Sequence, residues 1–254
     1  MSDGRWQWNR GNANVVFTSR VDGNLAQHVG DDPAAVVQRR MTTARAIGLD
    51  ADHIACVTQV HGADVWVDLE SEGSEVAADM RWSSTSMPDV RADALVTSRA
   101  GVGLAVGVAD CMPVAIVLGD AIAAVHVGWR SLALGILEST LLTLKRVAGS
   151  SAALANAGPY AVIGPSLGPC CMEIGEDVAI KFAPSSIVRR SAGAPPHLDA
   201  RAEARQRLEH RGVRVDVIDV CTKCEPQLFS HRASQSGGRP IGRQAMLVRR
   251  TAAD

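Results

Sequence analysis

Three side chains that bind soft metal ions stand in conspicuous sequence settings. His61 occurs in Gln-Val-His-Gly, Cys111 in Ala-Asp-Cys-Met-Pro, and His126 in Val-His-Val-Gly-Trp-Arg. Two imidazoles and one thiolate can hold a zinc ion in tetrahedral geometry while its fourth position stays open for water or substrate. The open position separates a catalytic zinc from a structural one. These residues therefore predict a catalytic metal site.

A two-residue turn predicts how the segments that carry Cys111 and His126 come together. Gly119–Asp120 separates two apolar runs, residues 113–118 and 121–127. Glycine suits the positive φ at the first central position of a type II′ turn, which is a common hairpin turn. The two runs are therefore predicted to form an antiparallel hairpin.

Proline provides a check on the register of this hairpin, because it has no N–H for a sheet hydrogen bond. Counting back from the turn, Pro113 pairs with His126 at a position where the strands exchange no hydrogen bonds. Cys111 then faces Gly128 and lies diagonal to His126 on one face, with Cβ atoms on the order of 7 Å apart. A turn one residue longer would place the two on opposite faces. The proline also allows regular pairing to stop before Cys111, and His61 must arrive by tertiary folding.

Each of the three residues also has an ordinary structural explanation when it is considered alone. A histidine on an apolar strand is more often a hydrogen-bonded core residue, and a buried cysteine more often packs as a small hydrophobic side chain. The prediction of a site depends on the Cys111–His126 pair sharing one face.

The rest of the chain predicts one mixed α/β domain over residues 1–254, with a substantial antiparallel part. Asp32 followed by Pro33 is typical of a helix N-terminus, and Gly48 and Gly149 are typical helix stops. We expect a loose, flexible lead-in at 1–12, an exposed loop at 70–90, and a stretch at 191–196 too short to separate two domains. Helices are predicted at 33–46, 132–147, 176–182 and 199–210, and strands at 14–19, 53–59, 64–69, 94–97, 102–108, 113–118, 121–127, 160–164, 213–220 and 244–249.

The composition favours a cytoplasmic enzyme. Hydrophobic residues make up 46% of the 254 residues and charged residues 21%, with a net charge of −1. This charge favours neither nucleic acid nor an anionic membrane, so we expect neither as a partner. The apolar runs are shorter than the roughly 18 residues of a membrane span, and the first residues lack a secretory signal. Six cysteines without such a signal indicate thiols in a reducing compartment. The expected state is a monomer or a small homo-oligomer.

Several motifs, in order along nearly the whole chain, resemble one protein family. This is the YfiH-type family of laccase-domain, or polyphenol oxidase family, proteins, whose members are also described as purine nucleoside phosphorylases. The resemblance implies a single α/β domain (α+β type) of four layers, α/β/β/α, with mixed, partly antiparallel sheets. The motifs are Gln59–Asp64, Ala109–Pro113, His126–Arg130, Ile163–Gly175, Asp219–Thr222, Phe229–Arg232 and Gly242–Gln244.

The resemblance also implies the chemistry. The family's His–Cys–His zinc site maps onto His61, Cys111 and His126. The implied activities are phosphorolysis of adenosine, inosine, guanosine and methylthioadenosine, together with adenosine deamination. The chain departs from the family pattern at Ser131, Met172 and His231, where a glycine, an aromatic residue and a tyrosine are common. These departures affect the shape of the pocket and hence the substrate preference.

Phosphorolysis needs a cation beside the sugar, and deamination needs an activated water. Arg130 precedes a helix predicted to start near Ser131, so its guanidinium and the first helix amides could converge on phosphate; an ordinary salt bridge is an equal explanation. Zinc can lower the pKa of water towards about 7, and a nearby group must shuttle protons. Candidates for the shuttle are Asp110, Asp64 and Glu173.

Three other functions compete with this one. Cys111 could act as a nucleophile with His126 as its base, in an amidase acting on a cell-wall precursor. Copper could occupy the site with Met112 nearby, as in a polyphenol oxidase, although seven histidines without a His-x-His pair cannot build a four-copper cluster. A non-catalytic binding protein would not need the three motifs together. Elsewhere, Cys221–Cys224 is half of a zinc ribbon or a redox pair, and Cys170–Cys171 is interpreted as shaping a tight loop.

Overall fold

The computed structural model describes residues 4–68, 75–149, 158–189, 191 and 193–250. Two mixed β-sheets stack on each other and a short ribbon lies apart from them. The five-stranded sheet has the spatial order β1 (Trp6–Arg10), β2 (Ala13–Phe17), β13 (Gln244–Arg250), β6 (Gly103–Val108) and β3 (Ile54–Ala55). The six-stranded sheet has the order β12 (Arg214–Val217), β9 (Tyr160–Ile163), β7 (Met112–Leu118), β8 (Ala121–Val127), β5 (Ala94–Thr97) and β4 (Val65–Val67). The ribbon pairs β10 (Ile187–Val188) with β11 (His197–Leu198).

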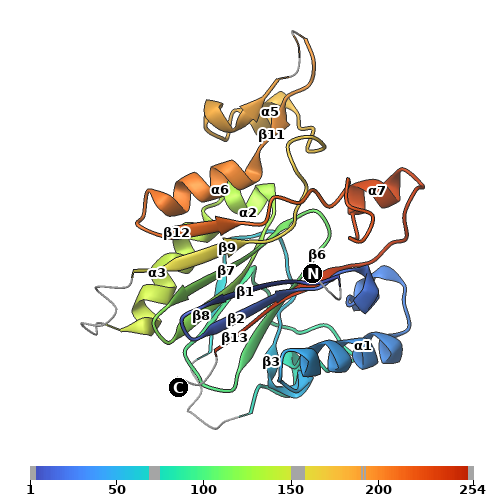
Figure 1. Ribbon diagram of the computed structural model, residues 1–254, viewed down its shortest axis with the longest axis vertical. Coiled ribbons are helices and arrows are strands. Elements are labelled where there is room, and N and C mark those ends of the chain that lie inside the picture. The colour runs from blue at the N-terminus through green and yellow to red at the C-terminus, as the bar shows by residue number, and fades with distance from the viewer. Residues whose placement is uncertain (1–3, 69–74, 150–157, 190, 192, 251–254) are drawn as a thin grey trace.

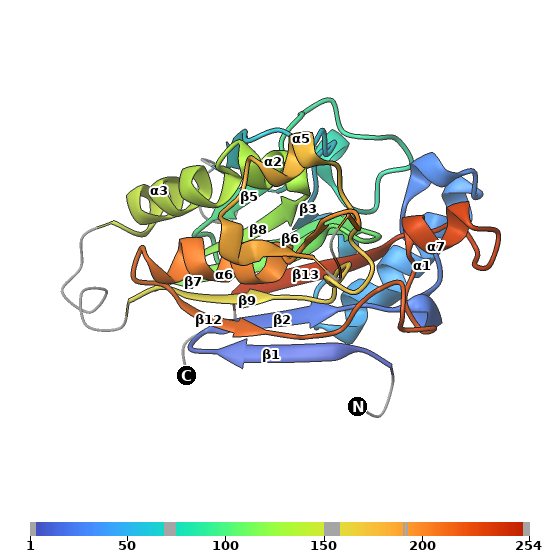
Figure 2. The same ribbon diagram turned by 90° about the horizontal axis from the view of Figure 1, so that it is seen from above.

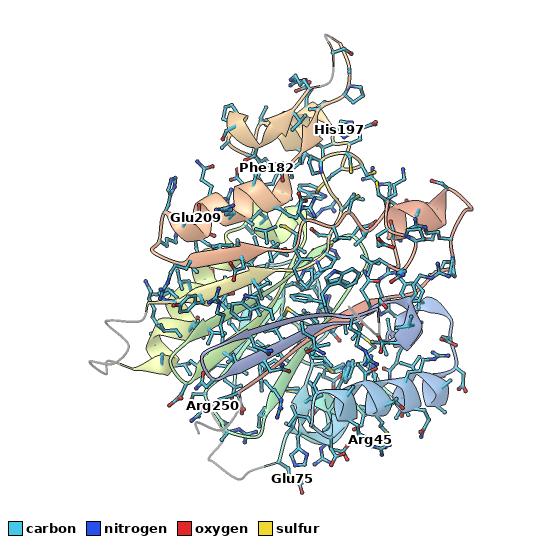
Figure 3. The ribbon with its side chains drawn as sticks, viewed as in Figure 1. Arg45, Glu75, Phe182, His197, Glu209 and Arg250 are labelled. Atoms are coloured by element: carbon cyan, nitrogen blue, oxygen red, sulfur yellow. The ribbon has the colours of Figure 1, made fainter. Side chains whose placement is uncertain are left out.

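Helices cover both outer faces of the stacked sheets (Figure 1). Figure 2 shows α1 and α3 on opposite sides of the molecule, and Figure 3 labels Arg45 of α1 and Glu209 of α6 on opposite sides of the stack. The described helices are α1 (Pro33–Ala46), α2 (Trp129–Ala133), α3 (Ile136–Ala148), α5 (Glu176–Ala179), α6 (Ala200–Glu209) and α7 (His231–Gln235).

Three apolar cores separate the four layers. One lies between α1 and the five-stranded sheet, one between the two sheets, and one between the six-stranded sheet and helices α2, α3 and α6. Strand β7 serves two of them, because successive side chains point to opposite faces. Val114 and Ile116 pack under the helices, whereas Ala115 and Val117 pack against the other sheet. The single domain with α/β/β/α layers is therefore confirmed.

The hairpin of β7 and β8 has the predicted register. The chain reverses at Gly119, whose φ of 56° lies at the first turn position, and Pro113 pairs with His126. The paired residues end at Met112, so Cys111 lies just outside the ladder. The proline stands close to the strand start, where it interrupts little pairing.

The Pro113–His126 pair bonds to its outer neighbours. The Pro113 carbonyl accepts the Gly164 N–H at 2.9 Å, and the His126 N–H donates to the Asp93 carbonyl at 2.7 Å. A non-hydrogen-bonded pair in an antiparallel ladder directs its polar groups outward in this way. The backbone of His126 is therefore tied to the residue that precedes β5.

Several expected elements differ in the structure. The single helix predicted at 132–147 is divided into α2 and α3, because Gly135 adopts a left-handed conformation with φ of 84°. Strand β1 lies within the expected lead-in at 1–12. Met80 and Trp82 are buried, so the segment expected as an exposed loop contributes to the core. Residues 1–3 of the lead-in, 69–74 of the expected strand and loop, and 192 of the expected linker lie outside the described ranges.

The start of α1 was predicted correctly. Asp32 is the N-cap, its carboxylate accepts the Ala34 N–H, and Pro33 opens the helix. No helix among the described residues is long and apolar enough to span a bilayer.

Candidate metal centre

The structure brings His61, Cys111 and His126 together. Their ligating atoms all lie within 4.8 Å of one another, and the Cys111 sulfur is 3.8 Å from Nε2 of His61. The two imidazole rings meet edge to face with centroids 4.8 Å apart. Zinc binds nitrogen at about 2.0–2.1 Å and sulfur at about 2.3 Å, so two nitrogens and one sulfur in a tetrahedral site lie roughly 3.3–3.6 Å apart. The three side chains fit a metal ion after small rotations.

A different local structure positions each of the three residues. His126 belongs to β8, with its side chain on the face opposite Val125 and Val127, which pack under the helices. Cys111 follows Asp110, which has a positive φ of 87°. His61, in the connection between β3 and β4, itself has a φ of 60°. Non-glycine residues rarely adopt positive φ, and such strained residues cluster at functional sites.

Asp93 connects the two imidazole-bearing segments, although no sequence motif predicts a role for it. Its Oδ1 accepts from Nδ1 of His126 at 2.8 Å and from the backbone N–H of His61 at 2.9 Å. Its Oδ2 accepts the N–H of Gly62 at 2.6 Å. Because Nδ1 of His126 is engaged, Nε2 faces Cys111 and is free to bind metal. A carboxylate behind a metal-binding histidine fixes its orientation and tautomer in this way.

Charge favours ligation by Cys111. Burial raises the pKa of its thiol, but the two neighbouring imidazoles outweigh burial and lower the pKa to about 6. Burial lowers the pKa of His126, but the Cys111 thiolate and the Asp93 carboxylate raise it to about 9. The thiolate is the form of cysteine that binds metal.

The three residues line a cavity of about 620 Å³, a size typical of small-molecule sites. Arg130 and Arg243 also line it. Burial lowers the pKa of Arg243, and the nearby charges of Cys111 and Asp110 offset part of this effect. Arg243 belongs to the motif 242–244, to which the sequence analysis assigned no role. Apolar side chains supply further lining: Leu25, Trp82, Met87, Val108, Leu167 and Met172.

Arg130 lies inside the first turn of α2 and not before it, because the helix begins at Trp129 and not near Ser131. Its guanidinium lies over the Trp129 ring at 4.3 Å from the centroid. Ser131 is buried, and its hydroxyl accepts the Gly128 N–H at 2.8 Å. The serine that departs from the family pattern therefore caps this helix.

Asp93 bonds to His126 and His61, whereas the three carboxylates proposed as proton shuttles have other surroundings. The Asp110 carboxylate accepts from the Thr222 hydroxyl at 2.6 Å and from the Arg232 N–H at 2.7 Å. Asp64 and Glu173 are exposed and do not appear among the cavity-lining residues. Asp110 does line the cavity, and its two carboxylate oxygens are engaged by Thr222 and by the backbone of Arg232.

Gly128 offers a test of how tightly the ligands are packed. It has a φ of −84° that alanine can adopt, but a Cβ there would lie 2.9 Å from Cδ2 of His61 and 3.3 Å from the Cys111 sulfur. We expect Gly128→Ala to displace the three side chains and to lower the affinity for a metal ion by about tenfold to a hundredfold, the range found when the support of a ligand is lost. Chelator competition would measure it. Gly238→Ala, where no atom lies within 4 Å, is the matched control, and equal affinities in both variants would contradict the expectation.

Comparison with known proteins gives a consistent picture. Residues 11–251 match the family model described as multi-copper polyphenol oxidoreductase laccase. A purine nucleoside phosphorylase of Streptomyces coelicolor is 32% identical over 247 residues, covering 91% of this chain and 94% of that protein. The crystal structure of YlmD from Geobacillus stearothermophilus superposes with a TM-score of 0.80 at 28% identity, covering 98% of this chain and all of that one. The Bacillus licheniformis YfiH structure gives 0.78 at 26% identity, covering 94% and 93%.

Proposed function

Because this chain belongs to the multi-copper polyphenol oxidoreductase laccase family, with relatives named purine nucleoside phosphorylases, we propose that it is a zinc-dependent purine nucleoside phosphorylase. The proposed substrates are phosphate with adenosine, inosine, guanosine or methylthioadenosine, and the same site would deaminate adenosine. One observation carries the proposal: the His61–Cys111–His126 group lies in the wall of a nucleoside-sized cavity that also contains Arg130.

The donor set supports zinc. His61, Cys111 and His126 would hold the ion through two nitrogens and one sulfur, with Asp93 holding the His126 ring in place. When bound, zinc would supply a Lewis acid with an open coordination position. Copper binds the same ligands, but the described residues contain only two clusters of metal-binding side chains, and only two of the seven histidines belong to one. This set is too small for the four-copper cluster of an oxidase.

Arg130 would hold the phosphate. Its guanidinium stacks on Trp129 and lies at the cavity wall, so its planar face is fixed while its N–H groups can bind two phosphate oxygens. In phosphorolysis a phosphate oxygen forms a bond to ribose C1′ while the bond from C1′ to the purine nitrogen breaks. Holding the two reactants in line would be the main contribution of this residue. Arg243 supplies a second positive charge in the same cavity.

The test is to follow adenosine and inosine on protein of known zinc content, with and without phosphate. We expect ribose 1-phosphate and free base to form only when phosphate is present. Conversion of adenosine to inosine without phosphate would support the deaminase activity. If the zinc-loaded protein turned over no nucleoside, the proposal would be wrong. The reaction requires neither nucleic acid nor membrane, and a cytoplasmic monomer or small homo-oligomer remains the proposed state.

A second candidate is a cysteine hydrolase, such as an amidase acting on a cell-wall precursor. One observation favours it: Asp93 bonds to Nδ1 of His126 at 2.8 Å, and the other side of this ring faces Cys111. A nucleophile, a base and an orienting carboxylate in this order form a catalytic triad. The same side chains serve both candidates, but zinc would block the nucleophile.

Alkylation separates the two candidates. In metal-free protein, iodoacetamide should react with Cys111 at a rate that rises with pH and is half-maximal near the pKa of about 6, because the thiolate forms above this pH. Cys56 is the internal control, since burial raises its pKa to about 11. Zinc should protect Cys111, and phosphorolysis should disappear with the metal. Amide hydrolysis that persists in metal-free protein would favour the hydrolase.

A further inference from the structure

Four cysteines converge in a second place. The sulfur atoms of Cys170, Cys171, Cys221 and Cys224 all lie within 4.8 Å of one another. The Cys224 sulfur is 3.8 Å from that of Cys170 and 3.6 Å from that of Cys171. None of the four forms a disulfide. Cys170 and Cys171, interpreted from the sequence as shaping a tight loop, therefore lie beside the Cys221–Cys224 pair.

The spacing matches a single tetrahedral ion. Four sulfurs at about 2.3 Å from a zinc ion lie roughly 3.8 Å from one another. A disulfide would bring two of them to about 2.05 Å. An iron–sulfur cluster would hold them farther apart, because several iron and sulfide ions lie between the cysteines.

Two tight turns present the four sulfurs. In the first turn, the Cys171 N–H donates to the Gly168 carbonyl at 2.9 Å, and in the second, the Cys224 N–H donates to the Cys221 carbonyl at 3.1 Å. The Gly168 N–H also points at the Cys221 sulfur, at 3.3 Å. An N–H directed at sulfur stabilises the thiolate that a metal ion needs.

The turns approach so closely that Gly168 cannot be replaced without a shift. A Cβ there would lie 2.8 Å from a nitrogen of Arg201 and 3.2 Å from Cβ of Cys221. The first turn is held from outside as well, because His197 bonds through Nδ1 to the Pro169 carbonyl at 2.8 Å. Figure 3 labels His197 in the upper part of the molecule, where the segment of α5 and β11 projects from the layers.

The two turns lie next to the candidate metal centre. The Thr222 N–H donates to the Ser166 carbonyl at 3.0 Å, which joins the two segments. The Thr222 hydroxyl and the Leu167 N–H both bond to Asp110, at 2.6 and 2.8 Å. Asp110 directly precedes Cys111, so whatever fixes the two turns also fixes this ligand.

We propose that Cys170, Cys171, Cys221 and Cys224 bind a zinc ion that joins the segments 166–172 and 219–225. Four thiolates fill a tetrahedral coordination sphere and leave no open position, so the ion is structural. It would hold the two turns together through four metal–sulfur bonds. The inference does not depend on the proposed nucleoside chemistry.

Zinc content and X-ray absorption of the full chain test the proposal. We expect two zinc ions per chain in the wild type and one in the double variant Cys170→Ser/Cys224→Ser. The variant His61→Asn/Cys111→Ser should keep one zinc ion with four sulfurs at about 2.3 Å. Cys56→Ser, which removes a thiol outside both clusters, should keep two ions.

The measurement on His61→Asn/Cys111→Ser decides the question even if the cysteine double variant fails to fold. Zinc bound by nitrogen or oxygen ligands in the His61→Asn/Cys111→Ser variant would overturn the proposal. So would a metal-free protein in which the four thiols form disulfides, or iron in place of zinc when both metals are supplied during expression. Loss of nucleoside turnover with both zinc ions retained would count against the proposed function alone.

Discussion

Replacing His61 by asparagine is expected to lower phosphorolysis by about a thousandfold or more, because a Lewis acid is worth several kcal/mol and each 1.36 kcal/mol is about tenfold in rate. His61 supplies one of three ligands, and the remaining two would not retain zinc. Asparagine is chosen because the residue has a φ of 60°, which asparagine tolerates better than alanine does. Steady-state rates and zinc content, measured together, would show whether the two fall in parallel.

This variant also separates the two candidate functions. It leaves Cys111, His126 and Asp93 in place, so a cysteine hydrolase would keep much of its activity. His53→Asn is the matched control, because His53 is exposed and does not line the cavity. A His61→Asn protein with unchanged nucleoside turnover would remove His61 from the proposed site.

Asp93→Asn should weaken both the metal centre and the fold. Asp93 is fully buried and accepts hydrogen bonds from the His126 ring and from the backbone of the segment that carries His61. Asparagine turns one acceptor into a donor that faces other donors. We expect zinc affinity to fall by about tenfold to a hundredfold and the free energy of unfolding to fall by about 1–3 kcal/mol.

The stability part of this prediction has a definite pH dependence. Burial raises the pKa of Asp93, but the hydrogen bonds from His126 and Gly62 and the charge of His126 outweigh it and lower the pKa below its ordinary value. A carboxyl with a lowered folded pKa stabilises the protein above its unfolded pKa of about 3.9, and loses this effect as the pH falls. The gap between wild type and variant should therefore be full at neutral pH and shrink below about pH 4.

Denaturant unfolding of the metal-free proteins at several pH values would measure this gap. Asp64→Asn is the control, since Asp64 is an exposed carboxylate in the connection that also carries His61. A gap that is the same at pH 3 and pH 7, or a variant with full zinc affinity, would contradict the role assigned to Asp93.

Half of the candidate metal site could be predicted from the sequence because its geometry is local. A glycine suited to one turn position sets the pairing of β7 with β8, and this pairing decides which face His126 occupies. A proline at the strand start agrees with the same register. Such inferences need only the two-residue period of a strand and the turn chemistry.

The remaining contacts of the two clusters join residues that are far apart in the chain. Asp93 is 33 residues from His126, and the Cys171–Cys224 contact spans 53 residues. An aspartate immediately before the apolar strand 94–97 is the one signal in the sequence that points to Asp93. Its partners could not be named, because the strand order β7-β8-β5 is set by the packing of the whole sheet.

The sequence by itself determined the helix start at Asp32, the hairpin at Gly119 and the chemical types of the candidate metal ligands, because caps, turns and side-chain alternation act over a few residues. Only the tertiary structure decided that His61 meets Cys111, that Asp93 supports both imidazoles, and that two separate cysteine pairs form one cluster. These contacts depend on which strands become neighbours when the three apolar cores are buried together. Burial of apolar surface is not directional, so no single segment contains that information.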